Sequence, residues 1–344
     1  MTVKRRIFIA LMSMGALLAG CTASVPDGEA IEPAGSTSPA PANSATLGLT
    51  YIPNVQFAPA YVAKEDGAFS RENVSVTIRH HGADEGLFTS LLAGHEDMVI
   101  ATGDEMIQAR SQGMDLISVG SYYAKYPVVI IVKDDSDIQS VADLKGKTVG
   151  LPGEYGSNYF GLLAALAEAD MTRDDISISV IGFTQLAALA GDQVDAVVGF
   201  TNNDTVQFGL SNIPVREIPL VADGEPPLVG ADIVTTTEFA RSHPEAVRGV
   251  LSGLKAGMTT CVTDPAHAVD VTRAYDTNLT TEDTVNAARA TLEATNQLFA
   301  PSGQVELHQN VETWKSMEVF LRAIDGVLGA AVDIEQAVTN EYLD

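Results

Sequence analysis

Short apolar runs alternate with amphipathic segments along most of this chain. The apolar runs predict strands at residues 45–51, 74–79, 97–102 and 116–122, and again at 127–132, 147–151, 177–181, 196–200 and 215–220. Between them, apolar residues recur at helical spacing, as in the helix predicted at residues 85–93, and after Pro244 the pattern is mostly helical. Regular alternation of strand and helix predicts an α/β fold with parallel-type sheets covered by helices on both faces.

The predicted strands form two groups of similar size. Extended segments near residues 126–127 and at 220–228 join them, and residues 228–235 predict a strand that returns to the first sheet. We therefore expect two lobes that face a cleft: lobe 1 from residues 46–126 and 225–344, and lobe 2 from residues 127–224. Ligands of such sheets lie beyond the carboxyl ends of the strands, so the loops that follow strands are the candidate site.

The first 45 residues have a different pattern. Three basic residues at positions 4–6 precede an apolar run at 7–18 and the sequence Leu18-Ala19-Gly20-Cys21, which is the layout of a signal peptide at residues 1–20. Residues 21–45 are rich in Pro, Ala, Ser and Gly and predict a disordered tether. The leader resembles the bacterial lipoprotein signal, which implies lipidation of Cys21. The alternative is an uncleaved anchor, for which the apolar run is short.

Charge and cysteine content exclude several functions. Without the three leader residues, the chain has 17 basic and 45 acidic residues, a formal charge of −28, so nucleic acid and anionic membrane surfaces are poor partners. Only Cys261 remains after Cys21, which excludes an intramolecular disulfide and a cysteine metal cluster; it is best explained as a core residue. His80 and His81 are adjacent and have no third ligand spaced with them, so no metal site is expected.

A glycine-rich turn at residues 150–161 is the first candidate site. It joins a buried strand to an apolar helix, where free helix N–H groups can hold an acceptor-rich ligand. Gly153 and Gly156 allow a close backbone approach, while Tyr155 offers a stacking face and Asn158 an amide. An ordinary tight turn capped by Asn158 is the alternative.

Other strand-following loops carry polar or aromatic residues. The two amides of Asn202 and Asn203 and the carboxylate of Asp204 could bind an amino-heterocycle, or Asp204 could cap a helix. Asn54 and Gln56 lie in a turn bounded by prolines, where they could contact a ligand or simply form the turn. Asp104 and Glu105 could likewise contact a ligand or serve as a helix cap and a first-turn acid. Tyr122, Tyr123 and Tyr126 precede the first crossing, where they could stack on a flat ligand or wedge the lobes.

Four stretches carry a resemblance to a known family: residues 51–59, 143–150, 152–156 and 198–204. Over residues 47–293 the chain resembles the solute-binding proteins of bacterial ABC importers, and within these the thiamine-pyrimidine branch, a group also similar to sulfonate-binding proteins. The resemblance implies a type II periplasmic-binding-protein fold that closes on a pyrimidine precursor of thiamine or on riboflavin. It also implies a monomer on the extracytoplasmic face, held by lipid on Cys21, with a permease and its ATPase as partners and no cofactor.

The resemblance and the loops together give one predicted ligand site, in which Asn203-Asp204 stands where relatives usually have Asn-Glu. Its members are Asn54, Gln56, Asp104, Glu105, Tyr126, Glu154, Tyr155, Gly156, Asn158, Asn203 and Asp204. A nitrate or sulfonate binder of the same fold is the alternative. It would need basic residues in these loops to bind the anion, and only Lys125 is present. An enzyme that makes the thiamine pyrimidine is the remote alternative. It would need a cysteine-rich motif and an identifiable cofactor lysine that this chain lacks, so we do not expect an enzyme.

Overall fold

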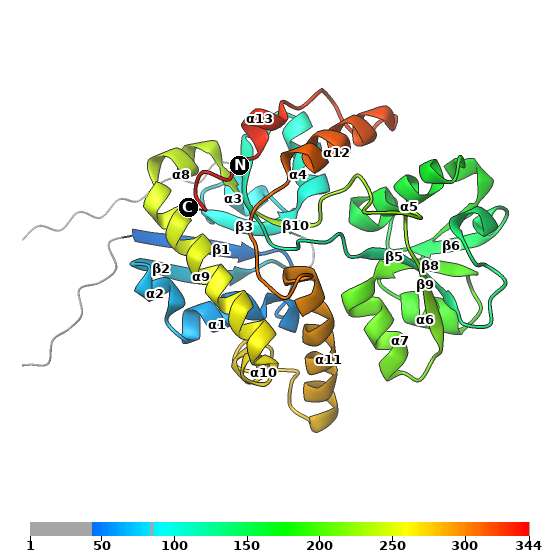
Figure 1. Ribbon diagram of the computed structural model, residues 1–344, viewed down its shortest axis with the longest axis horizontal. Coiled ribbons are helices and arrows are strands. Elements are labelled where there is room, and N and C mark those ends of the chain that lie inside the picture. Colours follow the sequence, from blue (N-terminus) through cyan, green and yellow to red (C-terminus); the bar gives the residue numbers. More distant parts are fainter. Residues whose placement is uncertain (1–42, 83–84, 344) are drawn as a thin grey trace, which may run out of the picture. The chain divides into compact units, whose positions relative to one another are not determined.

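Two five-stranded sheets form the framework of the chain in the computed structural model, which describes residues 43–82 and 85–343 (Figure 1). The first sheet has the order β2-β1-β3-β10-β4 and the second β7-β6-β8-β5-β9. Their bounds are β1 Asn43–Leu49, β2 Val74–His80, β3 Met98–Thr102, β4 Leu116–Ser121, β10 Ala231–Thr236; and β5 Val128–Lys133, β6 Thr148–Leu151, β7 Ser177–Val180, β8 Ala196–Phe200, β9 Val215–Ile218. We call the first sheet with its helices lobe 1 and the second lobe 2.

The start of β1 changes one predicted boundary. The proposed signal peptide, Cys21 and residues 22–42 of the proposed tether lie outside the described residues. Residues 43–45, which were expected to belong to the tether, are instead paired in register with Val74 to Val76 of β2. Ala45 is buried in this pairing, which explains why a small residue next to the Pro-rich segment can start a strand.

Both sheets are mixed rather than purely parallel. Strand β10 is antiparallel to β3 and β4, and β5 is antiparallel to β8 and β9. Each of these two strands enters its sheet directly after a crossing from the other lobe, so no helical crossover fixes its direction. The return of residues 231–236 to the first sheet agrees with the expected extended segment.

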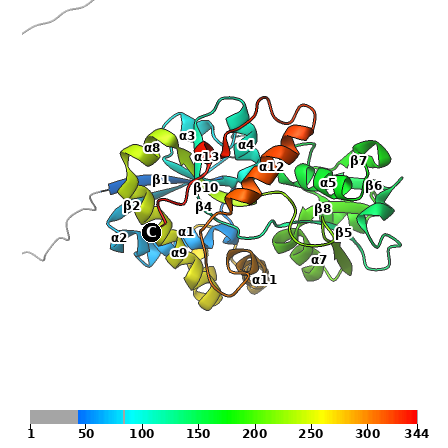
Figure 2. The ribbon, with the colours of Figure 1, turned by 45° about the horizontal axis from the view of Figure 1, so that its top comes forward.

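Helices cover both faces of each sheet (Figures 1 and 2). In lobe 1, α1 and α9 pack on one face and α4 and α12 on the other; in lobe 2, α5 packs on one face and α6 and α7 on the other. The helices are η1 Val55–Phe57, α1 Ala58–Glu65, α2 Ala68–Arg71, α3 Thr89–Leu92, α4 Gly103–Ser111, η2 Val141–Leu144, α5 Gly156–Glu168, η3 Arg173–Asp175, α6 Gln185–Ala190, η4 Thr201–Thr205, α7 Val206–Leu210, α8 Thr237–Ser242, α9 Pro244–Thr263, α10 Pro265–Thr272, α11 Glu282–Phe299, α12 Val311–Ala323 and α13 Ile334–Ala337.

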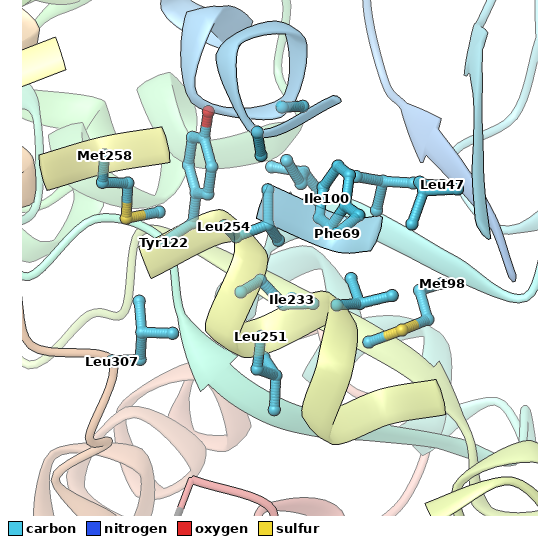
Figure 3. Packing of buried hydrophobic residues seen from close by; sticks show 14 of the residues in the cluster. Leu47, Phe69, Met98, Ile100, Tyr122, Ile233, Leu251, Leu254, Met258 and Leu307 are labelled. Atoms are coloured by element: carbon cyan, nitrogen blue, oxygen red, sulfur yellow. The ribbon is translucent and has the colours of Figure 1, made fainter. Parts of the chain in front are cut away.

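The largest part of the lobe 1 core lies between its sheet and α9. Leu47 and Ile233 of the sheet meet Leu251 and Leu254 of α9, and all four are buried (Figure 3). Burying one such side chain contributes about 1.5–3 kcal/mol. Helix α1 can approach α9 only because Gly257 has no side chain, since a Cβ there would lie 2.0 Å from the carbonyl oxygen of Pro59.

Three helices differ from the sequence prediction. The helix predicted at residues 85–93 is reduced to α3, and the short helices α8 and α13 were not predicted. All three contain four to six residues, too few for a helical period to stand out. Among the described residues, no helix has the length and apolar character needed to cross a membrane.

Candidate ligand site between the lobes

Asp104 and Ser157 join the two lobes. Asp104 lies in the first turn of α4 in lobe 1, and Ser157 lies in the first turn of α5 in lobe 2. The hydroxyl of Ser157 is 2.9 Å from Oδ2 and 3.1 Å from Oδ1 of Asp104, to which it donates. Both residues are buried. The first turns of two helices from different lobes therefore meet at one carboxyl group.

Tyr126, at the first crossing, completes this contact. Its hydroxyl lies 2.8 Å from Oδ2 of Asp104 and 2.9 Å from the carbonyl oxygen of Ser157. Its ring packs against apolar clusters of both lobes. In the described state Tyr126 thus acts as a wedge between the lobes, which was one of the two roles considered for it.

Burial and mutual repulsion perturb the carboxyl groups here. Burial raises the pKa of Asp104, although its hydrogen bonds oppose the shift. The pKa of Glu105 is raised to about 7, first by burial and then by the charge of Asp104. Among the described residues, neither carboxyl group has an ion pair to Lys, Arg or His. The junction is therefore an uncompensated acidic site.

The glycine-rich turn contributes backbone rather than side chains. Gly156 has φ +67°, and a Cβ there would lie 3.2 Å from Oε1 of Glu105. Asn158 donates to the carbonyl oxygen of Val198 at 2.9 Å, so its amide supports the second sheet and does not cap α5. Glu154 pairs with Arg173 at 2.7 Å. Tyr155 remains 62% exposed and available as a stacking face.

The loop after β8 forms a π-helical turn, η4, a form often found at functional sites. Oδ2 of Asp204 accepts from the backbone N–H of Phe200 at 2.7 Å, and burial raises the pKa of Asp204 to about 6. Asp204 is therefore held within its own loop, and Asn203 beside it is half-buried. Their role as ligand contacts stays a prediction.

Asn202 of the same loop, which lies outside the predicted site, makes a second hydrogen bond between the lobes. Its Nδ2 donates at 3.0 Å to the hydroxyl of Thr295 on α11, and its Oδ1 is buried with no hydrogen-bond partner among the described residues. In the sequence, Asn202 could not be distinguished from Asn203, its neighbour. The only available signal was the run of polar residues directly after a buried strand.

Asn54 and Gln56 act through the backbone in this state. Oδ1 of Asn54 accepts from the N–H of Gln56 at 3.0 Å and caps η1, while the carbonyl oxygen of Gln56 accepts from the hydroxyl of Tyr122 at 2.9 Å. Both side chains are half-buried. The turn-forming role considered for them is present, and contact with a ligand stays a prediction.

A cavity of about 160 Å³ lies beside the crossings and includes Tyr126 and Asp232 in its lining. Small-molecule pockets usually measure about 300–1,000 Å³, so this space is too small for a flavin. Four larger cavities, of about 380, 360, 570 and 430 Å³, have none of the predicted site residues in their linings. Within the described ranges, no group of three or more His, Cys, Asp and Glu side chains could hold a metal ion.

Comparison with known proteins places the chain in a family. Residues 54–268 match the family model described as NMT1/THI5 like. The chain belongs to this family. It is 30% identical to the riboflavin-binding protein RibY of Chloroflexus aurantiacus, over 95% of this chain and 94% of that protein. It is 28% identical to the formylaminopyrimidine-binding protein of Halalkalibacterium halodurans over 44% of this chain and 46% of that one. A pyrimidine phosphate synthase of Legionella pneumophila is 27% identical over 66% of this chain and 72% of its own.

Solved structures share the fold. The periplasmic aliphatic sulphonate binding protein SsuA of Escherichia coli superposes with a TM-score of 0.67 at 17% identity, covering 86% of this chain and 92% of that one. The alkanesulfonate-binding protein SsuA of Xanthomonas axonopodis gives a TM-score of 0.64 at 19% identity, covering 88% and 99%. The expected two-lobed periplasmic-binding-protein fold is thereby confirmed.

Proposed function

We propose that this protein is the extracytoplasmic solute-binding component of an ABC importer and captures a flat nitrogen heterocycle, riboflavin or a pyrimidine precursor of thiamine, between its lobes. The observation that carries the proposal is the 30% identity to a riboflavin-binding protein along 95% of the chain. The similarity to a formylaminopyrimidine-binding protein keeps the smaller heterocycle as the second ligand.

The charge at the lobe junction supports a neutral or cationic ligand. Asp104 and Glu105 are uncompensated, and Lys125, the only base in the strand-following loops, is exposed. An anion placed here would lose hydration without gaining a partner. The alternative, a nitrate or sulfonate binder, has support from SsuA structures that share only 17–19% of the sequence.

Binding rather than catalysis is favoured, although some relatives are named as synthases. The remaining thiol, Cys261, is buried, and burial raises its pKa, so it is a poor nucleophile. Its position within α9 agrees with the predicted role of a small core residue. We further propose a monomer attached to the membrane through lipid on Cys21, with a permease and its ATPase as partners.

Calorimetric titration of a soluble form that begins at Thr22 tests the ligand class. We expect riboflavin or the formylated aminopyrimidine to bind, and we expect taurine and nitrate not to bind, because among the described residues Asp104 and Glu105 have no basic partner. Tight binding of taurine or nitrate, with neither heterocycle bound, would replace the proposed ligand with the anion.

A further inference from the structure

Three carboxyl groups gather where α5 meets lobe 1. Asp104 and Glu105 lie at the start of α4, and Asp232 lies in β10. Asp232 is fully buried, and neither of its carboxyl oxygens has a hydrogen-bond partner among the described residues. Its pKa is raised well above the ordinary value, first by burial and then by the charge of Asp104. Asp104 and Asp232 are thus fully buried, and Glu105 beside them is half-buried.

Among the described residues, no Lys, Arg or His side chain forms an ion pair with Asp104, Glu105 or Asp232. The nearby charged groups are exposed or engaged with other partners: Lys125 at the first crossing is exposed, Arg110 of α4 pairs with Asp115, Arg173 of η3 pairs with Glu154, Lys315 of α12 pairs with Glu312 and Glu335, and His308 beside the cavity lies near Glu306. Holding three ionised carboxylates here would be costly, so at least one of them must be neutral.

The hydrogen bonds indicate which group is ionised. Asp104 receives the hydroxyls of Tyr126 and Ser157 and the N–H of Glu105, and it lies at the N-terminal ends of α4 and α5. These donors and helix dipoles favour the carboxylate. Glu105 accepts from the hydroxyl of Thr102, and Asp232 from no described group. The protons therefore reside on Glu105 and Asp232.

We propose that the cluster of Asp104, Glu105 and Asp232 takes up a proton when the lobes close, so that closure and ligand capture strengthen as the pH falls. The geometric reason is that, in the described arrangement, which we take as the closed state, Ser157 of lobe 2 bonds to Asp104 and Gly156 lies against Glu105. Opening exposes both carboxyl groups to water, which stabilises their ionised forms. This inference rests on the proposed capture of a ligand by lobe closure.

Glu105 determines whether lobe closure strengthens or weakens with rising pH, and over which pH range. Its pKa is about 7 in the closed state, against an ordinary value of 4.5 that we expect in the open state. Between these values the closed state holds a proton that the open state has lost, so closure weakens with rising pH by up to about tenfold per unit. Below the window both states are protonated, and above it both are ionised, so the dependence on Glu105 flattens.

Riboflavin titrations from about pH 5 to pH 8.5 test this linkage, because the imide N–H of riboflavin stays protonated in that range. We expect the Kd to rise with pH by at least about tenfold, with the steepest rise below about pH 7. Calorimetry at about pH 6 in two buffers of different ionisation enthalpy should detect uptake of about one proton per riboflavin bound.

Two variants locate the proton. Glu105→Gln keeps the side-chain shape and removes the ionisable group beside lobe 2, so it should flatten the pH dependence and reduce proton uptake. Asp232→Asn mimics a neutral Asp232 that is buried within lobe 1, so it should keep both. Glu293→Gln is the matched control, because Glu293 is exposed on α11, and it should behave as the wild type. A Kd that does not change with pH, together with no proton uptake, would overturn the proposal.

A measurement without ligand separates this proposal from the proposed function. Small-angle scattering of the unliganded protein should give a smaller radius of gyration at about pH 5.5 than at about pH 8.5, and Glu105→Gln should reduce the difference. If riboflavin fails to bind, the ligand class is wrong, but the change in radius still decides the proton linkage. Equal radii with pH-independent binding would reject the linkage and leave the binding function intact.

Discussion

The side-chain amide of Asn202 connects the loop after β8 to α11. It is fully buried, and one hydrogen bond connects it to Thr295. A neutral hydrogen bond contributes about 0.5–1.5 kcal/mol net. If the lobes separate at this contact, the hydrogen bond stabilises the closed state alone. Asn202 therefore affects affinity through closure even without touching the ligand.

Asn202→Ala should weaken binding of riboflavin by about fivefold, because the closed state loses one hydrogen bond of about 1 kcal/mol. Thr295→Val removes the same bond from the other lobe and should have a similar effect. Calorimetry on both single variants and the double variant checks this. Additive losses in the double variant would show that the two side chains do not act through their mutual bond.

The residue-level prediction of the site was incomplete for a physical reason. Asp104 was singled out because it follows a strand, but its partner Ser157 lies 53 positions later, and no local pattern encodes that distance. Glu154 and Asn158 were chosen for their chemistry, yet they bond to Arg173 and Val198. The sequence identified the loops that carry polar groups, but it could not show which groups face the other lobe.

At the level of elements, the glycine-rich turn and the long helices were predictable, whereas strand direction was not. The start of α5 follows from the glycines of residues 150–161, and α9 and α11 follow from their apolar periodicity. Strands β5 and β10 are apolar runs like their neighbours, and nothing in such a run distinguishes parallel from antiparallel pairing.

The leader is an element whose role can be tested separately. If the thiol of Cys21 carries the lipid, Cys21→Ser should release the protein from the membrane fraction or leave its precursor uncleaved, because one residue provides the whole attachment. Fractionation of cells with an antibody to the protein checks this. Normal processing and unchanged membrane retention would contradict the proposed lipid anchor.

At the scale of the whole described chain, two lobes meet through polar contacts and through an apolar cluster in which Phe160 and Ala164 of α5 pack with residues of lobe 1. Asp104–Ser157 and Asn202–Thr295 are hydrogen bonds between lobes, whereas the cores around α9 and α5 lie within them. The 160 Å³ cavity beside the crossings is too small for a flavin. A bound flavin therefore requires the lobes to lie farther apart than in the described arrangement, and a ligand that contacts both lobes shifts the population toward the arrangement that holds it.

Small-angle scattering of the soluble form during a riboflavin titration tests the central claim most directly, since capture between two lobes requires closure around the ligand. We expect the radius of gyration to fall as riboflavin saturates the protein, with its midpoint at a riboflavin concentration equal to the calorimetric Kd. Asn202→Ala should move that midpoint to higher riboflavin concentration. A radius that stays constant at saturating riboflavin would contradict capture by lobe closure.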